Sequence, residues 1–257
     1  MPALGPTFLA LALIVMTGFT VEAALGFGST IVVVALGSLF VPIDTILPAF
    51  VPLNIVLSTY IVVRGRRSID MRLLLSRILP AMVIGVPIGL LGYRYVPEQW
   101  LKRVFAMFVL VLGAIELRRE IAHPEDDAAK APVASTPLPP WAAWSLLLVG
   151  GVIHGAFATG GPMAVYVAGR VLGNDKAKFR ATLSTLWLVL NGILIGGYIA
   201  MKNITRASLT YSVLLAMPLA LGMLGGEWLH HRVSMRAFRL GVFALLAAAG
   251  VVLLARA

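Results

Sequence analysis

Cysteine is absent from the 257 residues, and charged residues make up only 12% of them. Without cysteine there are no disulfides, no thiolate metal sites and no cysteine nucleophile. With 60% hydrophobic residues and so few charges, a chain of this length cannot bury its apolar surface in a water-soluble core. The composition therefore predicts an integral membrane protein, with the lipid bilayer as its first partner.

Acidic residues are also scarce, and the formal net charge is +10. The basic residues lie in short loops between apolar runs, where they orient a membrane protein, so we expect no nucleic-acid partner. The chain has no HExxH zinc motif, and its GxG does not follow a strand as a nucleotide-binding loop would. We expect no metal and no cofactor, and the sequence is compatible with a homo-oligomer.

Ten apolar segments are present, five in each half of the chain. They span residues 4–21, 29–40, 45–63, 73–95, 100–115, 141–157, 162–172, 181–201, 208–229 and 238–255. A helix needs about 20 residues to cross a bilayer, and the second segment of each half is much shorter. The predicted fold is all-α and polytopic, with a broken or re-entrant helix early in each half.

The two halves align as a diverged repeat. A shift of 137 places Asn54 on Asn191, Gly85 on Gly222 and Gly113 on Gly250, and the segment lengths recur in the same order. The polar stretch between the halves is rich in proline, charge and small residues, as linkers are. We therefore predict a first membrane repeat over residues 1–115, a linker over 116–140 and a second repeat over 141–257.

Charge counting sets the expected topology. An odd number of crossings in each half inserts the halves in opposite senses, which makes them inverted-topology repeats. Fifteen basic residues then fall on one side of the membrane and six on the side of the N-terminus. The positive-inside rule predicts a cytoplasmic linker and both termini outside the cell membrane.

A glycine break separates the first and second segments of each half. Such breaks expose backbone groups that lipid cannot satisfy, and a half-helix that begins there presents free amide groups to an anion. Packing glycines and ordinary helix caps are the structural alternatives. The candidate binding residues at the two breaks are Gly26, Gly28, Ser29, Thr30, Gly160, Gly161 and Pro162. We expect alanine at Gly28 or Gly161 to abolish binding with little effect on stability.

Two repeat-related amides and two ionisable residues complete the candidate site. Asn54 and Asn191 each lie near the centre of a third segment, where an amide can donate to an oxyanion without trapping it by charge. Hydrogen bonding between helices is the alternative role. Glu22 and His154 precede the two breaks and could carry protons, although Glu22 would repel an anion when ionised and His154 could simply bond a backbone carbonyl.

The arrangement resembles the TauE/SafE family of sulfite and sulfonate exporters, also called the TSUP family. The resemblance rests on the two homologous halves, the GFGST stretch from Gly26 to Thr30, the GGP stretch from Gly160 to Pro162, and the linker. It implies a secondary transporter of the inner membrane that moves a small anion, commonly sulfite or an organosulfonate. The anion would bind near the midplane at the repeat interface. The family leaves the particular anion open, including a small carboxylate.

Two rival functions remain from the residues alone. An intramembrane hydrolase could use Ser29 as nucleophile and His154 as base, but no third orienting group is evident. A membrane scaffold would not need paired polar residues at mid-depth. We therefore predict a transporter and no enzyme.

Overall fold

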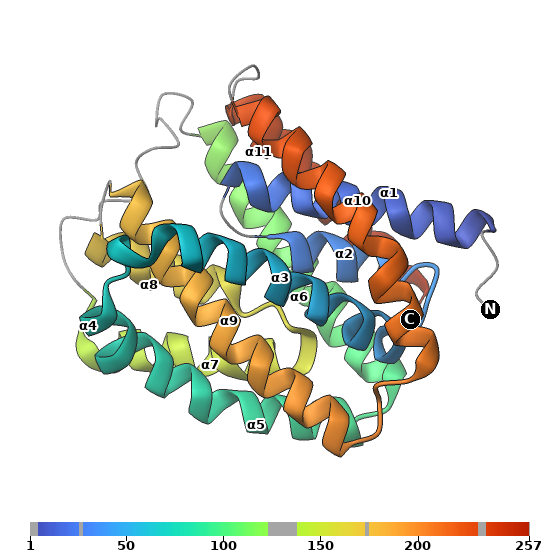
Figure 1. The fold of residues 1–257 in the computed structure, drawn as a ribbon, viewed down its shortest axis with the longest axis horizontal. Helices are drawn as coiled ribbons and strands as arrows, with labels where there is room; N and C mark the ends of the chain where they lie inside the picture. The colour runs from blue at the N-terminus through green and yellow to red at the C-terminus, as the bar shows by residue number, and fades with distance from the viewer. Residues whose placement is uncertain (1–4, 26–27, 123–137, 173–174, 231–234, 257) are drawn as a thin grey trace. The chain divides into compact units, whose positions relative to one another are not determined.

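Helices form every regular element in the part of the chain that the structure describes. The computed structural model describes residues 5–25, 28–122, 138–172, 175–230 and 235–256, and these contain no strand (Figure 1). The first half contains α1 (Pro6–Leu25), α2 (Ser29–Gly37), α3 (Ile43–Gly65), η1 (Arg66–Ser68), α4 (Met71–Leu73), the π-helical η2 (Leu74–Ile78), α5 (Leu79–Tyr95) and α6 (Glu98–Ala122). The second half contains α7 (Pro140–Phe157), α8 (Gly161–Leu172), α9 (Lys176–Ala200), α10 (Arg206–His230) and α11 (Met235–Arg256).

These helices follow the predicted segments closely. The two short segments are helices of 9 and 12 residues, α2 and α8. Six of the described helical stretches are long and apolar enough to cross a membrane, namely Pro6–Ala23, Ile43–Ser68, Met71–Tyr95, Pro140–Phe157, Ala177–Ala200 and Arg206–Gly226. The fold is thus that of an all-α polytopic membrane protein. Helix α6 continues to Ala122, so the first residues of the predicted linker are helical, and residues 123–137 lie outside the described part.

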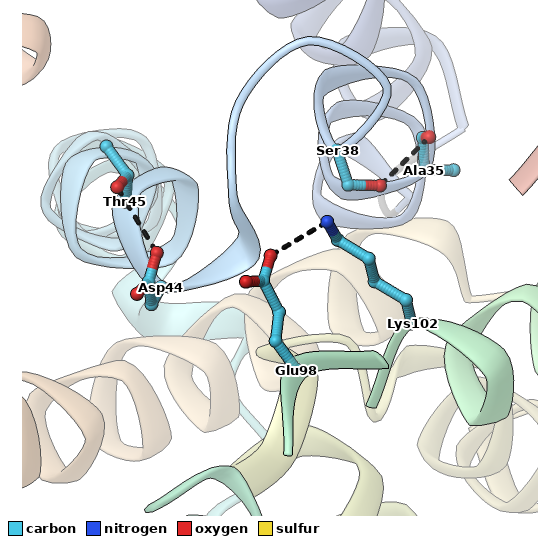
Figure 2. A network of polar contacts seen from close by, with 6 residues as sticks. All are labelled: Ala35, Ser38, Asp44, Thr45, Glu98 and Lys102. Atoms are coloured by element: carbon cyan, nitrogen blue, oxygen red, sulfur yellow. Dashed lines mark hydrogen bonds and ion pairs between the residues drawn. The ribbon is translucent and has the colours of Figure 1, made fainter. Parts of the chain in front are cut away.

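Local side-chain contacts explain where several helices begin and end. The Asp70 carboxylate accepts a hydrogen bond from the Leu73 amide at 2.9 Å, and so caps α4. Asp175 caps α9 in the same way. Figure 2 shows three further contacts of this kind, among them the Ser38 hydroxyl donating to the Ala35 carbonyl at the end of α2 and the Glu98–Lys102 ion pair in the first turns of α6. These contacts shape helix ends and leave the breaks themselves untouched.

The helices gather into two compact units, and each unit draws on both halves of the sequence. The first unit comprises Met1–Ala49, Val96–Ala128 and Ile204–Ala257, and therefore holds α1, α2, the start of α3, α6, α10 and α11. The second comprises Phe50–Tyr95 and Ala129–Asn203, with the rest of α3, then η1, α4, η2, α5, α7, α8 and α9. The predicted repeats divide the sequence, whereas the units combine helices from each repeat.

Glycines bring backbones together in the second unit, where α5 packs on α7. A Cβ atom on Gly85 would collide with the Leu148 carbonyl and one on Gly89 with the Val152 carbonyl. From the α7 side, a Cβ atom on Gly151 would collide with the Met82 carbonyl of α5. Side chains cannot be accommodated at these crossings, so the close approach of α5 and α7 requires glycine.

The first unit has the corresponding crossings. Helix α10 packs on α1, and Cβ atoms on Gly222 and Gly226 would collide with backbone carbonyls of α1. Helix α6 packs on α11, where a Cβ atom on Gly113 would lie 2.8 Å from the Ala247 nitrogen and one on Gly250 would lie 2.7 Å from the Leu110 nitrogen. Each contact joins a helix of one predicted repeat to a helix of the other. The contact of α5 with α7 corresponds to that of α10 with α1, as a duplicated sequence would produce.

Candidate functional site

The break between α7 and α8 lies in the second unit. Helix α7 ends at Phe157, and Ala158 closes it in a left-handed conformation with φ 55°, while its amide donates to the His154 carbonyl at 2.7 Å. A non-glycine residue in this region costs about 1 to 2 kcal/mol. Helix α8 begins at Gly161, one residue earlier than the proline predicted to start it. The chain thus passes from α7 to α8 within three residues, and the Gly160 amide just before α8 contacts His154 in the last turn of α7.

His154 anchors this break. Its side chain is only 2% exposed, and its Nδ1 atom accepts a long hydrogen bond of 3.4 Å from the Gly160 amide. Because Nδ1 is the acceptor, a neutral imidazole carries its proton on Nε2. Nε2 has no hydrogen-bond partner among the described residues. A buried donor without a partner is costly, so this N–H needs an explanation.

The two asparagines lie in the same unit and contact each other. The Asn191 side-chain nitrogen donates to the Asn54 side-chain oxygen at 2.9 Å, and both residues are buried. The Ser58 hydroxyl donates to the same oxygen at 3.4 Å. The alternative role, a hydrogen bond between helices, is therefore observed. It occupies only one of the two Asn191 amide hydrogens.

Asn191 also lies within reach of the His154 ring, although the two groups do not complete a hydrogen bond at Nε2. Trp187, one turn before Asn191 on α9, stacks on the imidazole with ring centroids 5.7 Å apart and planes 16° apart. A Cβ atom added to Gly161 would meet only Trp187 Cζ2, at 3.9 Å. The start of α8, the imidazole, the indole and the Asn191 amide therefore surround one small region.

The other break lies in the first unit. The Ser29 hydroxyl, at the first residue of α2, donates to the buried Glu22 carboxylate in the last turns of α1. Thr30 follows in the first turn of α2 and is half-buried. Gly28 precedes α2 with φ 107°, a conformation that side-chain-bearing residues rarely adopt. Alanine there is strained with or without a ligand, so the expectation that Gly28→Ala would leave stability unchanged is wrong.

The predicted site residues thus fall into two groups, one in each unit. The second unit brings together His154, Asn191, Asn54, Gly160 and Gly161, and Pro162 is the half-buried second residue of α8. The first unit holds Glu22, Gly28, Ser29 and Thr30, and Gly26 lies outside the described residues. The stacking of Trp187 was not predicted as part of the site, although its spacing of four from Asn191 placed both on one face of a helix.

The second group contains no acidic side chain and no lysine or arginine. The imidazole N–H, the Asn191 amide and the amides at the start of α8 are all hydrogen-bond donors, and the helix start adds a partial positive charge. In the described residues no group of three or more histidine, cysteine, aspartate or glutamate residues could hold a metal ion. These donors suit an anion that must be bound and then released.

Membrane-spanning helices, paired helix breaks and a buried set of neutral donors define a multi-pass membrane protein of the transporter class. Comparison with known proteins makes this specific. The family model described as "Sulfite exporter TauE/SafE" matches residues 10–253, so the chain belongs to the TauE/SafE family, whose members are transporters and not enzymes. The predicted family is confirmed, and the hydrolase reading is set aside.

A curated relative has the same general role. The chain is 29% identical over 178 residues to the "Probable inner membrane transporter protein TsaS" of Comamonas testosteroni. The aligned region covers 69% of this chain and 70% of that protein. No solved structure matches the chain significantly.

Proposed function

We propose that this transporter moves sulfite or an organosulfonate across the inner membrane, and that the anion binds in the second unit between His154, Asn191 and the start of α8. The family and the relative support the general activity. The observation that carries the site is the buried Nε2–H of His154, which has no partner among the described residues and lies beside the Asn191 amide.

The chemistry of a sulfur oxyanion fits these donors. A sulfonate or sulfite group has three oxygens, and the imidazole, the amide and the α8 backbone offer donors from α7, α9 and α8. The site also joins the two predicted repeats, because Asn54 belongs to the first and its partner Asn191 to the second. A small carboxylate is planar and has two oxygens in place of three, so it should match donors from three helices less well and bind less tightly.

Sulfite flux into liposomes that contain the purified protein tests the transport, and sulfite titration of its melting temperature tests the binding. The decisive variant is His154→Phe, which keeps a ring against Trp187 and removes both nitrogens. We expect folded protein that has lost about ten- to a hundredfold in sulfite affinity, as befits the loss of one hydrogen bond to a charged group. Acetate should stabilise the wild type less than sulfite does.

Normal sulfite binding by His154→Phe would show that the site lies elsewhere. Absence of sulfite and sulfonate flux in the wild type, with flux of a carboxylate instead, would replace the proposed substrate and keep the transporter.

A further inference from the structure

Tyr198 carries a second buried donor for which the described part of the chain offers no partner. Its side chain lies in α9 and is 0% exposed, and its hydroxyl has no hydrogen-bond partner among the described residues. Phenylalanine would fill the same space without the cost of an unpaired hydroxyl. Since the proposed anion site does not include Tyr198, the hydroxyl calls for a separate role.

Two polar residues, Tyr93 and Asn203, lie next to this tyrosine. The Tyr93 ring, near the end of α5, lies 5.5 Å from the Tyr198 ring between centroids. The Asn203 side-chain nitrogen donates to the Tyr93 hydroxyl at 3.2 Å, and the Asn203 backbone amide donates to the Tyr198 carbonyl at 2.8 Å. The C-terminal ends of α5 and α9 therefore meet in a cluster of two phenols and an amide.

Helix register connects this cluster with the proposed anion site. Trp187, Asn191 and Tyr198 are separated by four and seven residues, so they lie on one face of α9, and all three are buried. Seven residues of α-helix advance about 10 Å along the axis. Asn191 and Tyr198 therefore lie on the same face of α9, about 10 Å apart along its axis.

Charges at this end of α5 and α9 both weaken and favour the binding of an anion. Helix C-termini carry a partial negative charge, which weakens anion binding. Exposed basic side chains follow both tyrosines, Arg94 directly after Tyr93 and Lys202 in the turn after α9. Weak binding is useful at an end point, because an ion that is transported must also leave.

We propose that Tyr93, Tyr198 and Asn203 form a second, transient binding station for the transported oxyanion at the C-terminal ends of α5 and α9. The inference rests on the proposed function, since the station serves an anion that binds first beside Asn191. The phenol O–H of Tyr198 donates to the anion, Asn203 holds Tyr93 in place, and the nearby cations attract the anion toward the membrane surface.

Tyr198→Phe tests the station, because it removes only the hydroxyl. Sulfite flux into proteoliposomes should fall about three- to tenfold at sulfite concentrations below saturation, as expected for one lost hydrogen bond. The sulfite Kd from thermal titration should stay within about twofold of the wild type, since that Kd reports the tighter site beside Asn191. Tyr95→Phe is the matched control, because Tyr95 is at the same end of α5 but 70% exposed, and its flux should be unchanged.

A purely structural hydroxyl predicts a different result. Tyr198→Phe would then melt at the same or a higher temperature and transport sulfite at the wild-type rate, which overturns the station. Equal losses in flux and in sulfite affinity would also overturn it, because Tyr198 would then act through the first site. If Tyr198→Phe does not fold, Asn203→Ala decides by the same criteria.

The two proposals fail in distinguishable ways. A wild type that neither binds nor transports sulfite or sulfonates contradicts the proposed function. A wild type that does both, with His154→Phe impaired and Tyr198→Phe normal, contradicts only the station.

Discussion

The Asn191 amide donates a hydrogen bond to the Asn54 side-chain oxygen across 2.9 Å, joining two residues that are 137 positions apart in the sequence. The same shift of 137 relates these residues in the predicted repeat. The two central amides are therefore partners as well as counterparts. This hydrogen bond uses one of the two amide hydrogens of Asn191, and the proposed anion site uses the other.

The first prediction concerns this pair. Asn191→Leu and Asn54→Leu should each weaken sulfite binding about ten- to a hundredfold. The first removes a donor, and the second removes the acceptor that holds the Asn191 side chain in its orientation. Thermal titration of the purified variants with sulfite measures the effect. Ser212→Ala is the control, because it removes a buried hydrogen bond of 2.7 Å to Ala49 in the other unit and should lower the melting temperature without changing affinity. Wild-type affinity in both leucine variants would make the asparagines structural.

Gly161 gives a second prediction. A methyl group there meets only the edge of Trp187, so Gly161→Ala should leave the melting temperature of the empty protein nearly unchanged. If the anion approaches the α8 amides to within about 3 Å, the methyl group occupies its place and sulfite-induced stabilisation disappears. Gly196→Ala is a suitable control, since a Cβ atom at Gly196 has no neighbour within 4 Å.

Gly113 and Gly250 would be poor controls for this experiment. Their Cβ atoms would lie within 2.8 Å of backbone nitrogens on the partner helix, so alanine at either position should destabilise the α6–α11 crossing instead. Binding that survives in Gly161→Ala would mean that the open space beside Trp187 is not where the anion sits.

Glu22 carries a third prediction, on coupling. Its buried carboxylate accepts from the Ser29 hydroxyl beside the α1–α2 break, and intramembrane carboxylates of this kind serve as proton carriers in transporters. If it couples anion movement to protons, Glu22→Gln should retain sulfite binding while sulfite flux no longer responds to an imposed pH gradient. Flux measured with and without that gradient decides the matter. Glu98→Gln, in the surface ion pair of Figure 2, should keep the wild-type response, and a full response in Glu22→Gln would exclude the carboxylate as carrier.

The predicted topology gives a fourth test. The chain contains no cysteine, so single cysteines can be placed at Ala128 or Ser135 in the linker, which lie outside the described residues. They should resist an impermeant thiol reagent in intact cells and react after lysis, because the linker is expected in the cytoplasm. A cysteine at an exposed position of the opposite loop, Lys202, should react in intact cells. Labelling of the linker before lysis would mean that the protein has the opposite orientation in the membrane.

The sequence predicted the helices well because membrane-length apolar runs have few alternatives to helix. The start of α2 at Ser29 and the end of α7 at Phe157 agree with the predicted segments, since the glycine breaks mark them directly. The stacking of Trp187 on His154 and the close approach of Gly89 to the Val152 carbonyl depend on how helices cross. Crossing geometry comes from the packing of distant segments, which a single sequence does not encode in any local pattern. The buried hydroxyl of Tyr198, which has no partner among the residues that the structure describes, was missed for the same reason.

The mixed composition of the two units has a consequence for biosynthesis. Helix α1 packs on α10, which begins at Arg206, and α5 packs on α7 beyond the linker. At ordinary rates of translation the face of α1 that packs on α10 waits on the order of ten to forty seconds for its partner to leave the ribosome. The early helices must therefore be shielded by lipid or by the insertion machinery during that interval. A chain that stops after the first repeat would complete neither unit, because each unit contains helices from both repeats.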